Sequence, residues 1–189
     1  MLVATQMAFI TYITLFLTQV KGMTLFAAAA ILAGIQLGGG ATRVLVGRAS
    51  DRSGRRIPLF RKLALAGCAS LLVLAATAFA PMLPVLAVVV SVGWLLTMPF
   101  GLNYTATAEM VGPARVGTAF GLQGMLTSAG AVAGPAVFGL TVTAAGWRAG
   151  YLVLALACAG IWLVLAPLVP AEAGAWSRDP EPAAAGARS

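Results

Sequence analysis

The chain has 189 residues, of which 60% are hydrophobic and only 9% are charged, and its formal net charge is +7. Soluble domains carry about 25% charged residues, so this composition excludes an ordinary soluble domain. The sequence contains no histidine and no cluster of acidic residues, which excludes most metal sites and every nucleophile activated by a histidine base. We therefore expect neither enzyme activity nor a cofactor or metal.

Six apolar segments follow one another along the chain, each close to or beyond the roughly 20 residues that a helix needs to cross a bilayer. They cover residues 2–20, 25–47, 63–80, 83–104, 116–145 and 150–169. None alternates strictly between apolar and polar residues, which argues against an outer-membrane barrel. We expect an all-α membrane protein: a six-transmembrane-helix bundle over residues 1–170, then a disordered cytoplasmic tail over residues 171–189.

The first segment is interpreted as a spanning helix rather than as a signal peptide. No Lys or Arg precedes it, and its apolar run is longer than the stretch of about 7–15 residues typical of signal peptides. Polar residues along it, such as Gln6 and Tyr12, suit a helix that faces a water-filled cavity.

Positive charge gathers at alternate connections between these segments. The second connection holds Arg48, Arg52, Arg55, Arg56, Arg61 and Lys62, and the fourth holds Arg115. The first, third and fifth connections hold only Lys21 and Arg148. Because short cytoplasmic loops are rich in Lys and Arg, the pattern predicts that both termini are cytoplasmic. This asymmetry also accounts for the net charge, so we expect the lipid bilayer, and no nucleic acid, as a partner.

The most informative run is G-R-A-S-D-R-S-G-R-R at residues 47–56, a short basic connection between the second and third segments. Its pattern, G-x-x-x-D-R-x-G-R-R, resembles the cytoplasmic loop signature of the major facilitator superfamily. The matching positions are Gly47, Asp51, Arg52, Gly54, Arg55 and Arg56.

The resemblance extends from Leu2 to about Val169 and implies that the chain is one six-helix half of a twelve-helix fold. The fourth segment lacks an arginine expected of many N-terminal halves, and the stretch from Glu109 to Trp147 resembles helices ten to twelve, which favours the C-terminal half. A glycine-proline pattern in the fifth segment instead resembles that of the N-terminal half in antiporters. It consists of Gly121, Gly130, Gly134, Pro135 and Phe138, the last standing where the family has a glycine.

In this family the substrate binds between two halves and is exposed alternately to each side. The resemblance therefore implies secondary active transport of a small solute, with a small or organic anion as a candidate. It also implies a second half as partner, either a missing N-terminal half or a second copy of the chain. The alternative is a truncated or non-transporting six-helix membrane protein, which the start of the chain directly in a helix favours. Abundant Ala and Gly, with more Arg than Lys, favour a bacterial cytoplasmic membrane.

The resemblance also suggests a gate at the cytoplasmic ends of the helices. Asp51 would face the positive N-terminus of a helix in the opposite half, and the arginines would pair with Glu109. Exposed ion pairs contribute only about 0–1 kcal/mol, which suits a latch that must open. A charge cluster that only sets the topology is the alternative.

Polar side chains on the first, second, fourth and fifth segments are predicted to line the substrate cavity, with the third and sixth segments outside it. They are Gln6, Tyr12, Gln36, Asn103, Gln123, Thr127 and Ser128. Arg43, one turn before Gly47, either extends to the cytoplasmic interface along its own stem or contacts an anionic substrate. Glycine pairs such as Gly130 and Gly134 predict close helix contacts, and Pro99 predicts a kink in the fourth segment.

Overall fold

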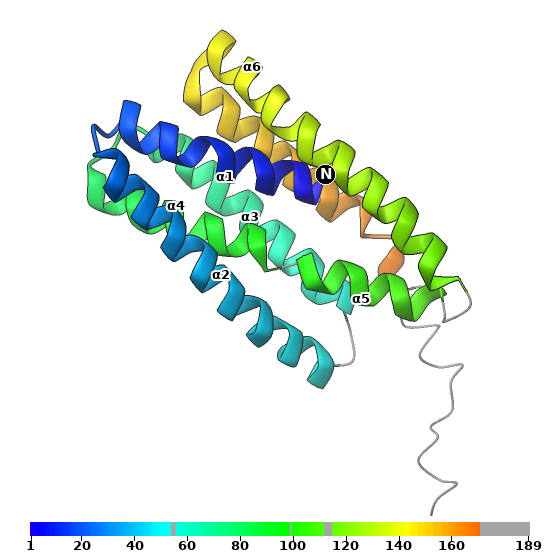
Figure 1. Cartoon of the computed structure of the whole chain (residues 1–189). Coiled ribbons are helices and arrows are strands. Elements are labelled where there is room, and N and C mark those ends of the chain that lie inside the picture. The colour runs from blue at the N-terminus through cyan, green and yellow to red at the C-terminus, as the bar shows by residue number, and fades with distance from the viewer. Residues whose placement is uncertain (54–55, 99, 112–114, 171–189) are drawn as a thin grey trace, which may run out of the picture.

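The computed structural model describes residues 1–53, 56–98, 100–111 and 115–170, and the regular structure in these ranges is helical. For residues 49, 51, 53, 56, 100–103, 109 and 110 only the backbone is described. The helices are α1 (Leu2–Gln19), α2 (Leu25–Ser53), α3 (Arg56–Thr77), α4 (Met82–Thr97), α5 (Phe100–Val111) and α6 (Val116–Val164). They form an elongated bundle (Figure 1).

Four of the described helices, α1, α2, α3 and α6, are long and apolar enough to cross a membrane, while the apolar α4 is shorter. With 49 residues, α6 would extend roughly 74 Å if it were straight, more than twice the roughly 30 Å of a bilayer core. It is not straight, because Gly146 interrupts it with φ 83° and ψ 173°. This backbone conformation is essentially restricted to glycine.

Gly146 divides α6 into a first arm (residues 116–145) and a second arm (residues 147–164), which fold back against each other (Figure 1). The fifth and sixth predicted segments are therefore joined by a single-residue elbow. The second arm begins three residues earlier and ends five residues earlier than the predicted segment 150–169.

The fourth predicted segment, residues 83–104, is two helices in the structure. α4 ends at Thr97, Met98 is a turn residue and α5 begins at Phe100. Proline lacks a main-chain N–H and disrupts the preceding turn of a helix, which accounts for an interruption at this point of the sequence. Pro99 itself lies outside the described residues.

The second connection is shorter than the sequence suggested. α2 continues as a helix to Ser53, so most of the basic run that we expected to be a loop is helical, and α3 already begins at Arg56. Arg52 lies in the last turn of α2, where a cation is stabilised by the negative end of the helix dipole. Pro58 lies in the first turn of α3, where its missing N–H breaks no helical hydrogen bond.

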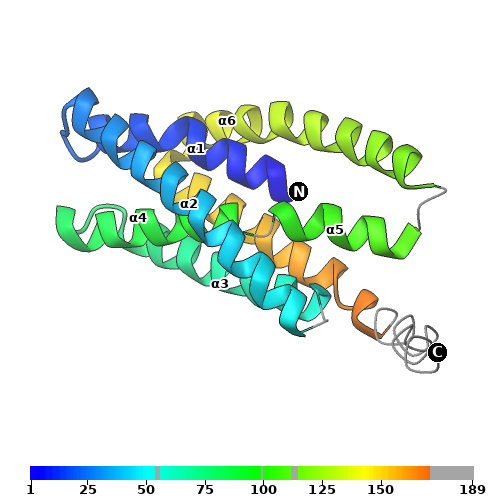
Figure 2. The ribbon, with the colours of Figure 1, turned by 60° about the horizontal axis from the view of Figure 1, so that its bottom comes forward.

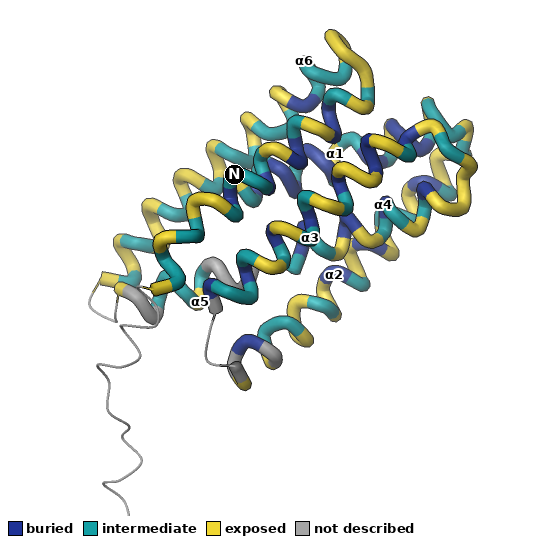
Figure 3. The backbone as a smooth tube through the Cα atoms, turned by 180° about the vertical axis from the view of Figure 1, so that it is seen from behind, coloured by how far each residue is buried: buried dark blue, intermediate teal, exposed yellow. Residues whose placement is uncertain are grey.

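The core lies among α1, α3, α4 and α6, while α2 lies at the edge of the bundle (Figure 3). In the apolar window of α2 only 17% of the residues are buried, against 44% in α1. α1 packs on α6, and α3 packs on α4 and on the second arm of α6, through Ala64 and Ile161. The first residue of α1 lies part-way along the bundle, so that α5 and the start of α6 extend beyond it (Figure 2).

Glycines allow several of these helices to approach closely. A Cβ atom on Gly134 would meet the main-chain carbonyl of Ala4, and one on Gly38 would meet the indole of Trp94. Likewise, a Cβ atom on Gly93 of α4 would meet the side chain of Ile35 on α2. The contacts between α1 and α6 and between α2 and α4 therefore depend on positions without side chains.

Candidate functional site

Arg43 lies where α2 meets the interruption between α4 and α5. Its Nε donates a hydrogen bond of 3.1 Å to the main-chain oxygen of Thr97, the last residue of α4. Carbonyl groups at the end of a helix lack the N–H partners that a continuous helix would supply. The guanidinium meets this need with a charged donor, and hydrogen bonds of this kind are stronger than neutral ones.

Thr97 is fixed from several sides. Its side chain is buried, and its hydroxyl donates to the main-chain oxygen of Gly93 at 2.7 Å. A Cβ atom on Gly39 of α2 would lie 2.7 Å from its methyl group, so the two helices are in close contact here. The two roles considered for Arg43 from the sequence did not include this contact, which links α2 to a broken membrane helix.

The predicted cavity residues of α1 and α2 have different surroundings. Gln6 is 3% exposed, and its Oε1 has no hydrogen-bond partner among the described residues. Tyr12 is half-buried against the first arm of α6, with its ring 5.1 Å from that of Phe138. Gln36 is exposed on α2.

The predicted cavity residues of α6 lie at another level of the bundle. Gln123 and Thr127 are half-buried and, being four residues apart, share one face of the first arm. Both amide atoms of Gln123 are buried with no partner among the described residues. Ala4 packs at Gly130 and Gly134, so Gln123 lies roughly 10 Å further toward the start of α6 than the contact with α1.

The remaining predicted cavity residues have few described contacts. Asn103 lies on α5, but its side chain is outside the described residues. The next residue, Tyr104, places α5 against α6 through a ring contact of 5.4 Å with Phe120. Ser128 is exposed. Among the described side chains, the structure therefore joins Arg43 to Thr97 but does not gather the predicted polar residues into one cluster.

The signature residues are only partly described. Gly47 lies within α2, and a Cβ atom on it would meet nothing within 4 Å. Arg52 is exposed. The gate itself stays a prediction, because its other members lie outside the described residues or side chains. These members are Asp51, Gly54, Arg55, Arg56 and Glu109.

Three cations whose positions in the sequence indicated only membrane topology make specific contacts. Lys21 Nζ donates to the main-chain oxygen of Ala80 at 2.7 Å, and the guanidinium of Arg148 lies 5.1 Å from the ring of Phe79. At the other end of the bundle, Arg61 Nε donates to the main-chain oxygen of Trp162 at 3.3 Å, and its guanidinium lies 4.7 Å from the indole centroid. These partners are 59 and 101 residues apart for the two hydrogen bonds, so no local pattern could reveal them.

An aromatic cluster beside the elbow of α6 also went unnoticed in the sequence. The ring of Phe16 on α1 lies 5.3 Å from that of Trp147 and 5.4 Å from that of Tyr151. Tyr151 is fully buried, and its hydroxyl has no partner among the described residues. The available signal was the spacing of Trp147 and Tyr151, four residues apart just after Gly146.

Comparison with known proteins identifies the fold. The sequence matches the Major Facilitator Superfamily over residues 1–185. The chain belongs to this superfamily. Membership, together with the long apolar helices, makes it an integral membrane protein with a partial fold of the major facilitator type.

Two relatives of this superfamily member come from Mycobacterium tuberculosis. It is 30% identical over 170 residues to the uncharacterized MFS-type transporter Rv2994 of strain H37Rv, and 29% identical to the uncharacterized MFS-type transporter MT3072 of strain CDC 1551. Each alignment covers 90% of this chain but 37% of the relative, so the chain spans just over a third of their length. No solved structure matches it.

Proposed function

We propose that the chain forms one half of a secondary carrier that moves a small solute across a bacterial cytoplasmic membrane by alternating access. The proposal rests on membership of the superfamily and on a chain that spans 37% of relatives named as transporters. The C-terminal half remains the favoured assignment. Alternating access needs a second half, because the substrate site of such carriers lies between two halves.

The uncovered apolar side chains on the surface of the bundle support the presence of a second half. α2 leaves large apolar side chains uncovered, among them Phe26 at 86% and Leu37 at 78% exposure. The first arm of α6 does the same at Met125 and Val132. These faces are available to a second half, either one encoded upstream or a second copy of this chain.

Cross-linking distinguishes the possible partners. A Leu37→Cys variant, with Cys68 and Cys158 replaced by Ala, should form a covalent dimer in membranes if the partner is a second copy. If the partner is an upstream half, cross-links should appear only when that half is co-expressed. Leu72→Cys on α3, which is also exposed, serves as the control. If Leu37→Cys and Leu72→Cys cross-link to the same extent, and no solute is taken up under any condition, a non-transporting protein is favoured.

We propose a small or organic anion as substrate, with Arg43 as its cationic contact beside the broken fourth span. The planar guanidinium carries five donors in a fixed fork, which suits carboxylates, and lysine cannot reproduce this geometry. Uptake of labelled anions by proteoliposomes that contain the complete carrier tests the proposal. Arg43→Lys should insert normally but lose anion uptake, whereas Arg48→Lys, the same change at an exposed position of α2, should retain it. Undiminished uptake by Arg43→Lys would refute the anion contact.

A further inference from the structure

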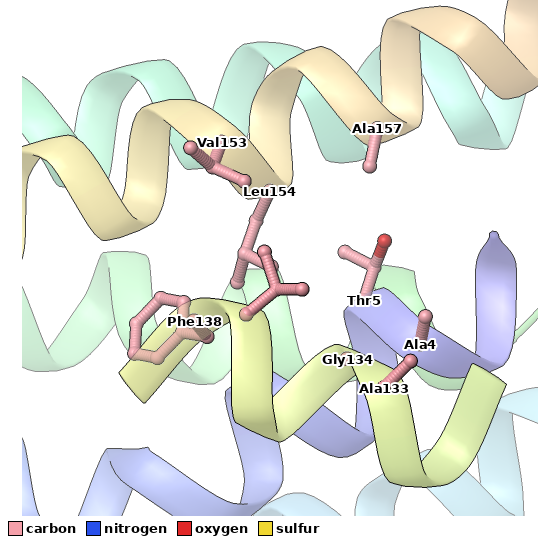
Figure 4. Close-up of a pocket in the computed structure, with 9 residues that line it drawn as sticks. Ala4, Thr5, Ala133, Gly134, Phe138, Val153, Leu154 and Ala157 are labelled. Atoms are coloured by element: carbon pink, nitrogen blue, oxygen red, sulfur yellow. The ribbon is translucent and has the colours of Figure 1, made fainter. Parts of the chain in front are cut away.

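An apolar crevice of about 170 Å³ lies between α1 and the two arms of α6 (Figure 4). Its lining includes Thr5 of α1, Gly134 and Phe138 of the first arm, and Val153 and Ala157 of the second arm. Thr5 is the one polar side chain in the lining, and its hydroxyl already donates to the main-chain oxygen of Met1 at 3.1 Å. That hydroxyl can still accept, so the crevice offers water one side-chain partner, fewer than the roughly two to four that an ordered water needs.

With the elbow of α6 at the membrane surface, the crevice lies near the middle of the membrane. Gly134 is 12 residues before Gly146, which places it roughly 18 Å along the first arm from the elbow. Half of a hydrocarbon core is about 15 Å thick. Lipid chains reach this depth, whereas headgroups do not.

The rim of the crevice is apolar on both arms. Val137, which lines the crevice, is 52% exposed, and Leu140 one turn away on the first arm is exposed as well. On the second arm, Leu152 and Leu156 flank Val153 and are exposed. Leu152 and Leu156 lie on the second arm, which is not part of the face proposed to contact a second half, so on this side the rim contacts hydrocarbon.

We propose that the crevice binds the terminal part of one hydrocarbon chain of a membrane lipid. An apolar cavity of about 150 Å³ stays dry and takes up apolar molecules of the size of benzene, and this crevice is of that size. Left empty, its lining would lose dispersion contacts that a chain end restores. The lipid chain would lie beside the close contact between Gly134 and Ala4, and so between α1 and both arms of α6. This proposal depends on membrane insertion and not on the proposed transport function.

Photolabelling of the full chain tests the proposal. The chain is reconstituted into vesicles of phosphatidylethanolamine and phosphatidylglycerol, doped with a phosphatidylethanolamine that carries a diazirine at the end of one acyl chain. After illumination, adducts are located by mass spectrometry. We expect several-fold more adducts at residues 133–137 and 153–157 than at the exposed face of α3 around Leu72 and Val73.

Two opposite substitutions sharpen the test. Ala157→Leu fills the crevice and should abolish the excess labelling, whereas Val153→Ala enlarges it and should increase the labelling. Ala136→Leu, on an exposed position of the first arm outside the lining, adds the same volume and should change nothing. Equal labelling of the crevice and of α3, or an excess that neither Ala157→Leu nor Val153→Ala changes, would overturn the proposal. Val153→Ala decides the matter if Ala157→Leu fails to fold.

Discussion

Arg43 connects two helices through a hydrogen bond to a main-chain oxygen at the end of α4. Arg43→Gln should remove the charged donor and destabilise the fold by about 1–2 kcal/mol, since such bonds contribute about that much. The loss should be local, so amide hydrogen exchange should accelerate at the end of α4 more than in α1. Gln36→Ala, an exposed change on the same helix, should leave exchange and thermal unfolding in detergent unchanged. Equal exchange in Arg43→Gln and the native chain would contradict the assigned contact.

Gly134 is a position where even one methyl group does not fit. Its Cβ atom would meet main-chain atoms of Ala4, which cannot rotate away as a side chain could. Gly134→Ala should therefore force α1 and α6 apart at a cost of about 1–3 kcal/mol. Gly121→Ala on the same arm meets nothing within 4 Å and should be neutral or stabilising by up to about 1 kcal/mol, because alanine favours helices over glycine. Thermal unfolding of both variants in detergent checks the difference.

At the scale of the helices, the elbow of α6 requires the backbone conformation of Gly146 rather than the space around it, since a Cβ atom added there would meet nothing within 4 Å. Gly146→Asn should cost about 1–3 kcal/mol, because φ 83° with ψ 173° is open essentially to glycine. Gly22, after α1, has φ 65°, and asparagine tolerates the left-handed region better than other side chains, so Gly22→Asn should cost less than about 1 kcal/mol. Similar thermal unfolding temperatures for the two variants would contradict this account.

The sequence predicted the helical membrane fold, because apolar runs of spanning length follow one another along the chain. It failed at the basic run, because charge density suggested a loop whereas Arg, Ser and Asp are all compatible with the end of a helix, and α2 continues to Ser53. The partner of Arg43 could not be predicted, because Thr97 lies 54 residues away and its carbonyl is available only where α4 ends. The burial of Tyr151 depends on the fold of the elbow and went unnoticed for the same reason.

For the whole molecule, the orientation in the membrane is a prediction from the distribution of Lys and Arg over the connections. Lys21 and Arg148 both contact the turn between α3 and α4. In a background without Cys68 and Cys158, Thr24→Cys should react with a membrane-impermeant maleimide in intact cells. Arg115→Cys should react only after permeabilisation. Both positions are exposed, so the reverse pattern would mean that the chain is inserted the other way round.

The elbow lets the two arms of α6 shift only slightly relative to each other along their axes. A single residue spans at most about 3.6 Å, so it cannot absorb a larger stroke of the first arm along its axis. A larger displacement of the first arm along its axis would therefore require the second arm to move with it. Trp162 of that arm accepts a hydrogen bond from Arg61 of α3 through its main-chain oxygen, so a displaced second arm would carry the start of α3 with it or break this bond. The two arms of α6 in this way connect the face that the first arm leaves uncovered with the start of α3.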